Sequence, residues 1–218
     1  MIAWHPILVL ESATVMFLRY TFDSPMVRDE EHGFIRHYDV DVFGFGEDGE
    51  HLIGKVAFDV FLWGDAEAVG ASLLDICDAD SQGWYDVFCA LSGRETFGGG
   101  GRDEILPELG IEDVVDRITF VWRFLLHPEA RSDYTKAVVQ DIARYVGDES
   151  ILTTWHGTLG MPDSDLVDMG FSKVGGTTLI FRDLHLQAPY AARHPLGEEI
   201  GFEARRQHEE WVVKEWGK

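Results

Sequence analysis

Histidine and cysteine are the residues of this chain that could most readily hold a metal ion or act as nucleophiles. The sequence has nine histidines and two cysteines, Cys77 and Cys89. No two histidines have the HxxxH or HExxH spacing that places both imidazoles on one helix face, and the cysteines form no CxxC pair. The sequence also contains no G-x-S-x-G nucleophile turn and no Walker phosphate loop. We therefore predict no metal site and none of the chemistries that depend on those motifs.

A run of four glycines at residues 98–101 is the remaining motif that could bind phosphate. A loop that cradles phosphate follows a strand and opens a helix. This run follows a predicted helix and continues into Ile105, Leu106 and Pro107. We interpret it as a flexible linker.

Acidic residues outnumber basic ones by 39 to 18, which gives a formal net charge of −21. This charge argues against direct binding to nucleic acid, because each lysine or arginine contact with phosphate would work against a repulsive field. Four interpretations stay open: a surface that keeps the protein soluble, adaptation to salt, a cationic partner or substrate, and mimicry of nucleic acid.

The apolar content, 45% of the residues, is that of a globular domain with its own core. No apolar run approaches the roughly 18 residues of a membrane-spanning helix. The N-terminal stretch also lacks the basic start and the cleavage site of a signal peptide. We therefore expect a cytoplasmic protein that does not bind membranes and whose two cysteines are reduced.

The first half of the chain predicts strands followed by helices. β-Branched and aromatic side chains predict a strand at residues 13–22. Apolar alternation at residues 38–42 and 52–62, with Asp48 and Gly49 between them, predicts a long antiparallel hairpin. From residue 66 to residue 92 the apolar spacing changes to three and four residues, which predicts helices.

The second half alternates strands and helices. Residues 118–126 predict a strand, and an apolar stripe from Tyr134 to Val146 predicts a helix with Ser132 or Asp133 as its N-cap. A short strand at 151–155, a short helix at 163–169 and a hairpin at Gly175-Gly176 follow. The last residues predict a polar helix.

This order of elements over residues 118–184 resembles the C-terminal core of the GNAT superfamily of acyl-CoA N-acyltransferases. The resemblance implies an α/β (α+β) fold with a mixed, mostly antiparallel central sheet of six or seven strands and helices on both faces. We assign residues 1–190 to this domain, with a helical insertion at about 66–110, and residues 191–218 to a C-terminal helical tail.

The resemblance also implies a site for acetyl-CoA or another acyl-CoA as co-substrate. In the family two central strands splay apart, and the pantetheine arm pairs with the exposed edge of the first, which corresponds here to Leu125, Leu126 and His127. The diphosphate binds at the start of the next helix, where free N–H groups and the helix dipole favour an anion. Here that helix would contribute Arg131, Ser132 and Lys136.

This chain departs from the family at the diphosphate loop. The family reads Arg/Gln-x-x-Gly-x-Gly/Ala, and the chain reads Arg131-Ser132-Asp133-Tyr134-Thr135-Lys136, in which only Arg131 fits. We expect Tyr134 and Lys136 to hinder the approach of phosphate to the backbone. Asp133 would repel the diphosphate, with Arg131 and Lys136 as partly offsetting cations; alternatively, Asp133 only caps the helix.

The general acid of the reaction also departs from the family's pattern. Many members carry a tyrosine four residues before the Gly-Phe pair, and Leu166 stands there in this chain. His156, directly after the short strand, is the nearest group with a suitable unperturbed pKa. Asp59, on a strand that would flank the acceptor cleft together with Asp39 and Asp41, is the candidate base. The alternative is that His156 is an ordinary packed or solvent-facing residue and that these carboxylates only keep the surface soluble.

Two functions follow from these observations. The first is an N-acyltransferase that moves an acetyl or acyl group from acyl-CoA to an amine-bearing small molecule or a basic protein or peptide. The second is a catalytically inactive protein of the same shape that binds a macromolecule through its acidic surface, in one version by mimicking nucleic acid.

Overall fold

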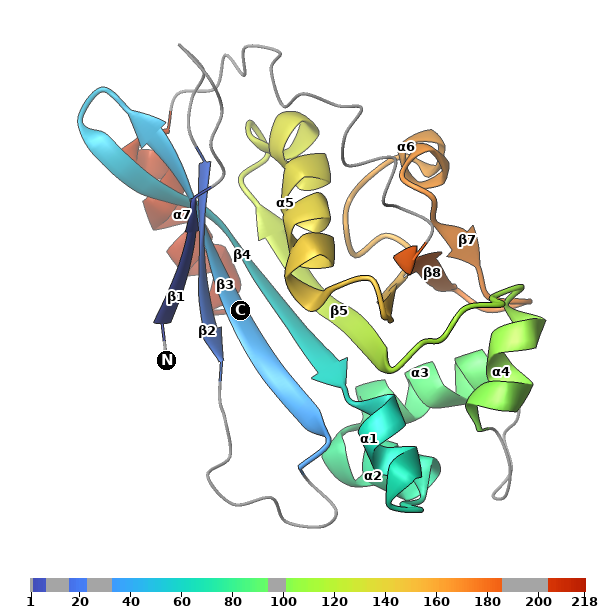
Figure 1. Ribbon diagram of the computed structural model, residues 1–218. Coiled ribbons are helices and arrows are strands. Elements are labelled where there is room, and N and C mark those ends of the chain that lie inside the picture. The colour runs from blue at the N-terminus through green and yellow to red at the C-terminus, as the bar shows by residue number, and fades with distance from the viewer. Residues whose placement is uncertain (1, 7–15, 23–32, 94–100, 186–203) are drawn as a thin grey trace.

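The computed structural model describes residues 2–6, 16–22, 33–93, 101–185 and 204–218. Its centre is a single sheet with the strand order β1-β2-β3-β4-β5-β6-β8-β7 (Figure 1). The strands are β1 (Ile2–Pro6), β2 (Met16–Phe22), β3 (Ile35–Gly46), β4 (Gly49–Phe61), β5 (Arg117–Leu126), β6 (Ser150–Trp155), β7 (Ser172–Lys173) and β8 (Leu179–Asp183).

The predicted fold class is confirmed. Every neighbouring pair of these strands is antiparallel except β5 and β6, which are parallel. The described sheet has eight strands, and the one that the sequence did not predict is β1, which pairs with β2 at the edge. The predicted hairpin is formed by β3 and β4, and it turns between Gly46 and Gly49, where Gly49 has a φ of 124°.

Helices cover both faces of the sheet. They are α1 (Trp63–Ala68), α2 (Leu73–Asp80), α3 (Gln82–Ser92), α4 (Arg102–Glu108), α5 (Arg131–Val146), α6 (Asp163–Asp168) and α7 (Arg206–Trp216). Figure 1 shows α5 in front of the sheet, α7 behind β3 and β4, and α1 to α4 gathered at the end of β4. Among the described residues, none of these helices is long and apolar enough to cross a membrane.

Two apolar cores result from this arrangement. In the first, Val56, Phe58 and Val60 of β4 lie in one cluster with Tyr134 and Val138 of α5. In the second, side chains of the opposite face pack against the helices of the insertion, with Phe61, Trp84 and Phe120 in edge-to-face contact. β4 is therefore buried over most of its length on both faces.

Two helices begin or pack differently from the expectation. The N-cap of α5 is Ala130 and not Ser132 or Asp133, so the helix begins earlier than the sequence predicted. Residues 191–203 of the expected helical tail lie outside the described residues, and its remainder forms helix α7, which packs against β4 and buries His208 and Val212. Arg123 of β5 donates to the carbonyl oxygen of Trp216 at 2.7 Å and so holds the end of α7 on the sheet.

Candidate functional site

The parallel strands β5 and β6 separate halfway along β5. Their pairing runs from Arg117–Ser150 to Val121–Thr154. β5 continues through residues 122–126, whereas the chain after β6 turns toward β8, with the His156 N–H donating to the Thr178 carbonyl at 2.8 Å. The second half of β5 therefore has an edge on the β6 side with no partner strand among the described residues.

A β-bulge at Trp122 marks the point of separation. Phe58 of β4 faces Val121 and Ala57 faces Arg123, so Trp122 has no partner residue on β4. A bulge bends its strand and increases the local twist. This bend directs the second half of β5 away from β6.

The direction of the free edge follows from the pairing of β5 with β4. The His127 N–H donates to the Ile53 carbonyl at 2.8 Å, and the register continues with Leu125 opposite Lys55. Because backbone groups of successive residues point to opposite edges of a strand, those of Phe124 and Leu126 face the gap. Of the three residues predicted to meet pantetheine, only Leu126 lies with its backbone groups on the open edge.

The other two, Leu125 and His127, direct their N–H groups to β4. The carbonyl of His127 is also used, because it accepts the Ala130 N–H at 2.9 Å. Phe124 is the edge residue that the sequence did not indicate, since the bulge at Trp122 shifts the alternation by one residue.

The first turn of α5 follows this edge directly. Ala130 provides no side-chain cap, and the first intrahelical bond runs from the Tyr134 N–H to the Ala130 carbonyl at 3.0 Å. The N–H groups of residues 131–133 have no carbonyl to pair with inside the helix, and the helix dipole is positive at this end. The turn is therefore suited to an anion.

Arg131 contributes a cation to the same turn. Its guanidinium lies against Gly160, where a Cβ atom would be 2.9 Å from Nη1. Its Nε atom is buried and has no hydrogen-bond partner among the described residues. Arg131 is thus positioned beside the turn at residues 157–160, with its Nε donor unpaired among the described residues.

The side chains of Tyr134 and Lys136 do not lie where they were expected to hinder the approach of a diphosphate to the backbone. The Tyr134 side chain is fully buried in the core beneath α5. Lys136 Nζ is 3.1 Å from Asp165 Oδ1 of α6, so its charge is directed to α6. Ser132 lies in the first turn of α5, where it offers its backbone N–H.

His156 lies next to this region but is already paired. Its Nε2 atom is 2.7 Å from Asp163 Oδ1 at the start of α6, and its side chain is 38% exposed. The hydrogen bond with His156 holds the pKa of the Asp163 carboxyl below its usual value. Because Arg131 touches Gly160 and His156 binds Asp163, both lie at the turn between β6 and α6.

Asp59 lies on the face of the sheet opposite α5, and both oxygens of its carboxylate accept hydrogen bonds. Trp84 Nε1 donates to Oδ2 at 3.1 Å, Trp122 Nε1 donates to Oδ1 at 3.2 Å, and His37 Nδ1 lies 2.9 Å from Oδ1. Asp59 is itself buried. This arrangement makes Asp59 the group that holds the bulge residue Trp122 rather than an open base.

His37 completes this cluster as a cation. Its Nε2 atom lies 3.4 Å from Asp80 Oδ1. The hydrogen bonds with Asp59 and then with Asp80 raise the pKa of His37 to about 10, against the effect of its partial burial. The sequence contained one signal for this pair, because His37 stands opposite Asp59 in the β3–β4 hairpin.

A second cluster, formed by His127, Glu129 and His208, has residue types that bind metals. The Nδ1 atom of His208 accepts the Arg205 N–H at 2.9 Å, and that of His127 accepts the Glu129 N–H at 3.3 Å. A neutral imidazole whose Nδ1 is an acceptor carries its proton on Nε2 and offers no lone pair there. The hydrogen bonds thus suit the docking of α7, with Trp211 against the His127 ring at 4.9 Å, better than a metal ion.

Comparisons with protein-family models, with curated proteins and with solved structures found no match to this chain.

Proposed function

We propose that this protein is a GNAT-like N-acyltransferase that moves an acetyl or other acyl group from acyl-CoA to an amine. The observation that carries the proposal is the separation of β5 from β6 beyond Val121, with the uncapped start of α5 directly after it. The free edge of β5 offers hydrogen bonds to an extended amide-bearing chain. The start of α5 and Arg131 offer N–H groups to a diphosphate.

The reaction needs little more than orientation of the two substrates. The amine nitrogen attacks the thioester carbonyl carbon, a C–N bond forms, the C–S bond breaks, and a proton passes from the amine to the departing thiolate. Backbone N–H groups on the β5 edge would stabilise the oxyanion. His156, held by Asp163, is the proposed proton donor to the thiolate. Asp59 is proposed only to position Trp122, because its carboxylate already accepts three hydrogen bonds.

Two glycines provide a matched test of the α5 site. Gly160→Ala is expected to weaken acetyl-CoA binding about tenfold, because the new Cβ would displace the Arg131 guanidinium. Gly157→Ala is the control, since Gly157 also has a positive φ but nothing lies within 4 Å of its would-be Cβ. Isothermal titration calorimetry with acetyl-CoA gives both affinities.

Both variants carry the strain of an L-residue at positive φ, about 1–3 kcal/mol, so Gly157→Ala shows the effect of that strain without displacement of Arg131. Equal acetyl-CoA affinities in both variants would remove Arg131 from the site. Absence of binding to the parent protein at millimolar acetyl-CoA would contradict the proposed function itself.

A second candidate function, binding of a basic partner, is favoured by one observation. The segment around α4 encloses a cavity of about 650 Å³ whose wall combines Leu106, Pro107 and Ile111 with Asp103, Glu112 and Asp113. Val114 in the same wall is 67% exposed. An apolar groove with acidic side chains would suit a basic, partly apolar peptide.

Neutralising Asp103, Glu104, Glu108 and Glu112 together should weaken binding of a polyamine or a basic peptide at low salt. The loss should shrink as salt rises, because screening removes the contribution of exposed charges. Fluorescence anisotropy with a labelled oligolysine at two ionic strengths measures both effects. Unchanged affinity at low salt would show that these acids serve solubility alone.

A further inference from the structure

A separate cavity of about 580 Å³ lies at the opposite end of β5 from the open edge. It is enclosed by the last turn of α5, the first residue of β5 and the start of α1. Its volume is within the range of small-molecule sites, roughly 300–1,000 Å³. It also lies where the helices of the insertion meet the sheet.

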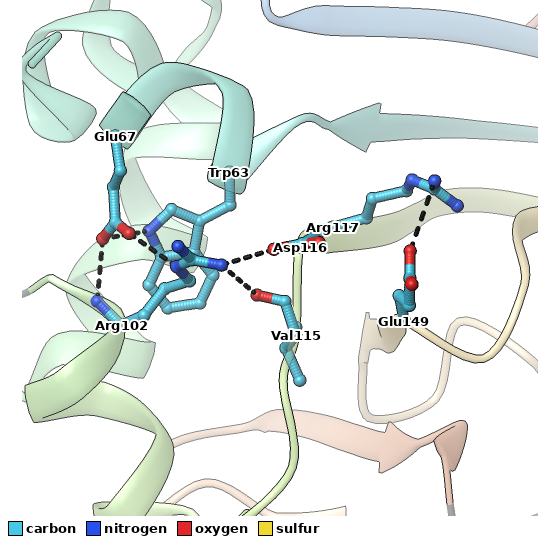
Figure 2. A network of polar contacts seen from close by, with 7 residues as sticks. All are labelled: Trp63, Glu67, Arg102, Val115, Asp116, Arg117 and Glu149. Carbon is cyan, nitrogen blue, oxygen red and sulfur yellow. Dashed lines mark hydrogen bonds and ion pairs between the residues drawn. The ribbon is translucent and has the colours of Figure 1, made fainter. Parts of the chain in front are cut away.

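Three arginines line this cavity, and two of them bind other residues: Arg102 holds the insertion, and Arg117 holds the end of α5. Arg102 of α4 is bound to Glu67 of α1, with Nε 2.5 Å from Oε2, and to Asp116 before β5 (Figure 2). Arg117 donates from Nη1 to the Val146 carbonyl at 3.0 Å, and its Nη2 lies 3.7 Å from Glu149 Oε2. A guanidinium has five N–H donors, so Arg117 keeps some for a ligand.

Arg36 is different, because its exposed side chain has no ion pair or hydrogen bond with any residue in the described ranges. The chain has 39 acidic residues against 18 basic ones, so carboxylates are abundant. An arginine at the wall of a cavity that pairs with no carboxylate of the described residues can bind a ligand. The hydroxyl of the neighbouring Tyr38 likewise makes no hydrogen bond within the described part of the chain.

Apolar and aromatic side chains form another part of the wall, beside the charged residues Asp65 and Asp116. Val60, Leu62 and Val146 are buried members of the wall. The rings of Tyr38 and Tyr145 also line it and lie in edge-to-face contact, with centroids 5.7 Å apart. This surface fits a flat or apolar body of modest size.

We propose that this cavity binds a small organic carboxylate. Its carboxylate is held by Arg36 and Arg117, and its apolar or aromatic body lies against Tyr38 and Tyr145. The planar guanidinium matches a carboxylate in a bidentate geometry. Asp65 and Asp116, which also line the cavity, favour a single negative charge over a phosphate dianion. This site does not depend on the proposed acyl transfer.

Three probes of nearly equal size test the sign of the charge that the cavity prefers: phenylacetate, phenylacetamide and phenethylamine. The net charge of −21 attracts the amine and repels the carboxylate. A preference for phenylacetate therefore has to come from local groups. We expect phenylacetate to bind tightest in ligand-observed NMR titrations, and phenethylamine to bind weakest.

Two arginine variants then locate the site. Arg36→Gln should weaken phenylacetate binding about tenfold. Arg144→Gln removes the same charge but should leave phenylacetate binding unchanged, because Arg144 is exposed on α5 and does not line the cavity. Asp65→Asn should tighten binding severalfold. Equal effects of the two arginine variants, tighter binding of phenethylamine, or no binding of any probe would each overturn the proposal.

Discussion

Asp59→Ala is expected to lower the free energy of unfolding by about 2–4 kcal/mol, the largest effect among the polar residues considered above. The carboxylate accepts hydrogen bonds from Trp84, Trp122 and His37, and the Trp84 indole is buried. Without Asp59 the Trp84 N–H loses its acceptor in a dry environment, which costs more than the bond itself contributes. Urea denaturation monitored by circular dichroism measures the change.

Asp39→Ala is the matched control, because Asp39 is an exposed carboxylate on the neighbouring strand β3. Its stability should remain within about 0.5 kcal/mol of the parent protein. If Asp59→Ala were as mild as Asp39→Ala, the cluster around Asp59 would not be holding Trp122 or α3.

The same cluster predicts a dependence of stability on pH. The pKa of His37 is raised from 6.5 to about 10 in the folded protein. Its charged form therefore contributes stability fully below about pH 6.5, and this contribution is lost as the pH rises through 10. The contribution is modest because the His37 side chain is 54% exposed. A His37→Gln variant should flatten this part of the stability profile, and an unchanged profile would contradict the pairing with Asp59.

Gly54→Ala is expected to have the second large effect, because it acts on the open half of β5. A Cβ at Gly54 would be 2.2 Å from Leu126 Cδ2 and 2.6 Å from the Leu125 carbonyl oxygen. The backbone of β5 must shift to accommodate it, at a cost of about 1–3 kcal/mol. Acetyl-CoA binding should fall by at least tenfold, because the edge at Phe124 and Leu126 moves with it.

Gly176→Ala provides the comparison, since nothing lies within 4 Å of its would-be Cβ and its φ is not positive. It should keep both the stability and the acetyl-CoA affinity of the parent protein. If Gly54→Ala lost stability but bound acetyl-CoA with unchanged affinity, the edge of β5 would not be the binding surface.

The sequence predicted the elements well where a periodic pattern was strong. The alternation in β3, β4 and β5 and the apolar stripe of α5 each gave an element of the correct type. The start of α5 was misplaced because Ser132 and Asp133 are good capping residues, whereas the observed N-cap, Ala130, is buried in the core. Packing decided that boundary, and capping preference did not.

The site was harder to predict because it depends on register and on contacts between distant residues. No local pattern shows that Trp122 is a bulge, and the bulge determines that Phe124 and Leu126 face the gap. The alternation of β4 places Asp59 on a strand face expected to be solvent-exposed, and no local pattern shows that Trp84 of α3 covers it. Lys136 looked like a phosphate ligand, and only the position of α6 shows that it pairs with Asp165.

The most direct test of the proposed acyl-CoA site is amide hydrogen exchange with and without acetyl-CoA, read at single residues by NMR. We expect slower exchange at Phe124 and Leu126 on the open edge of β5 and at residues 131–133 in the first turn of α5. Leu125 should change little, because its N–H already faces β4. Binding of acetyl-CoA that leaves Phe124, Leu126 and the first turn of α5 unprotected would contradict the proposed site, as would the absence of any binding.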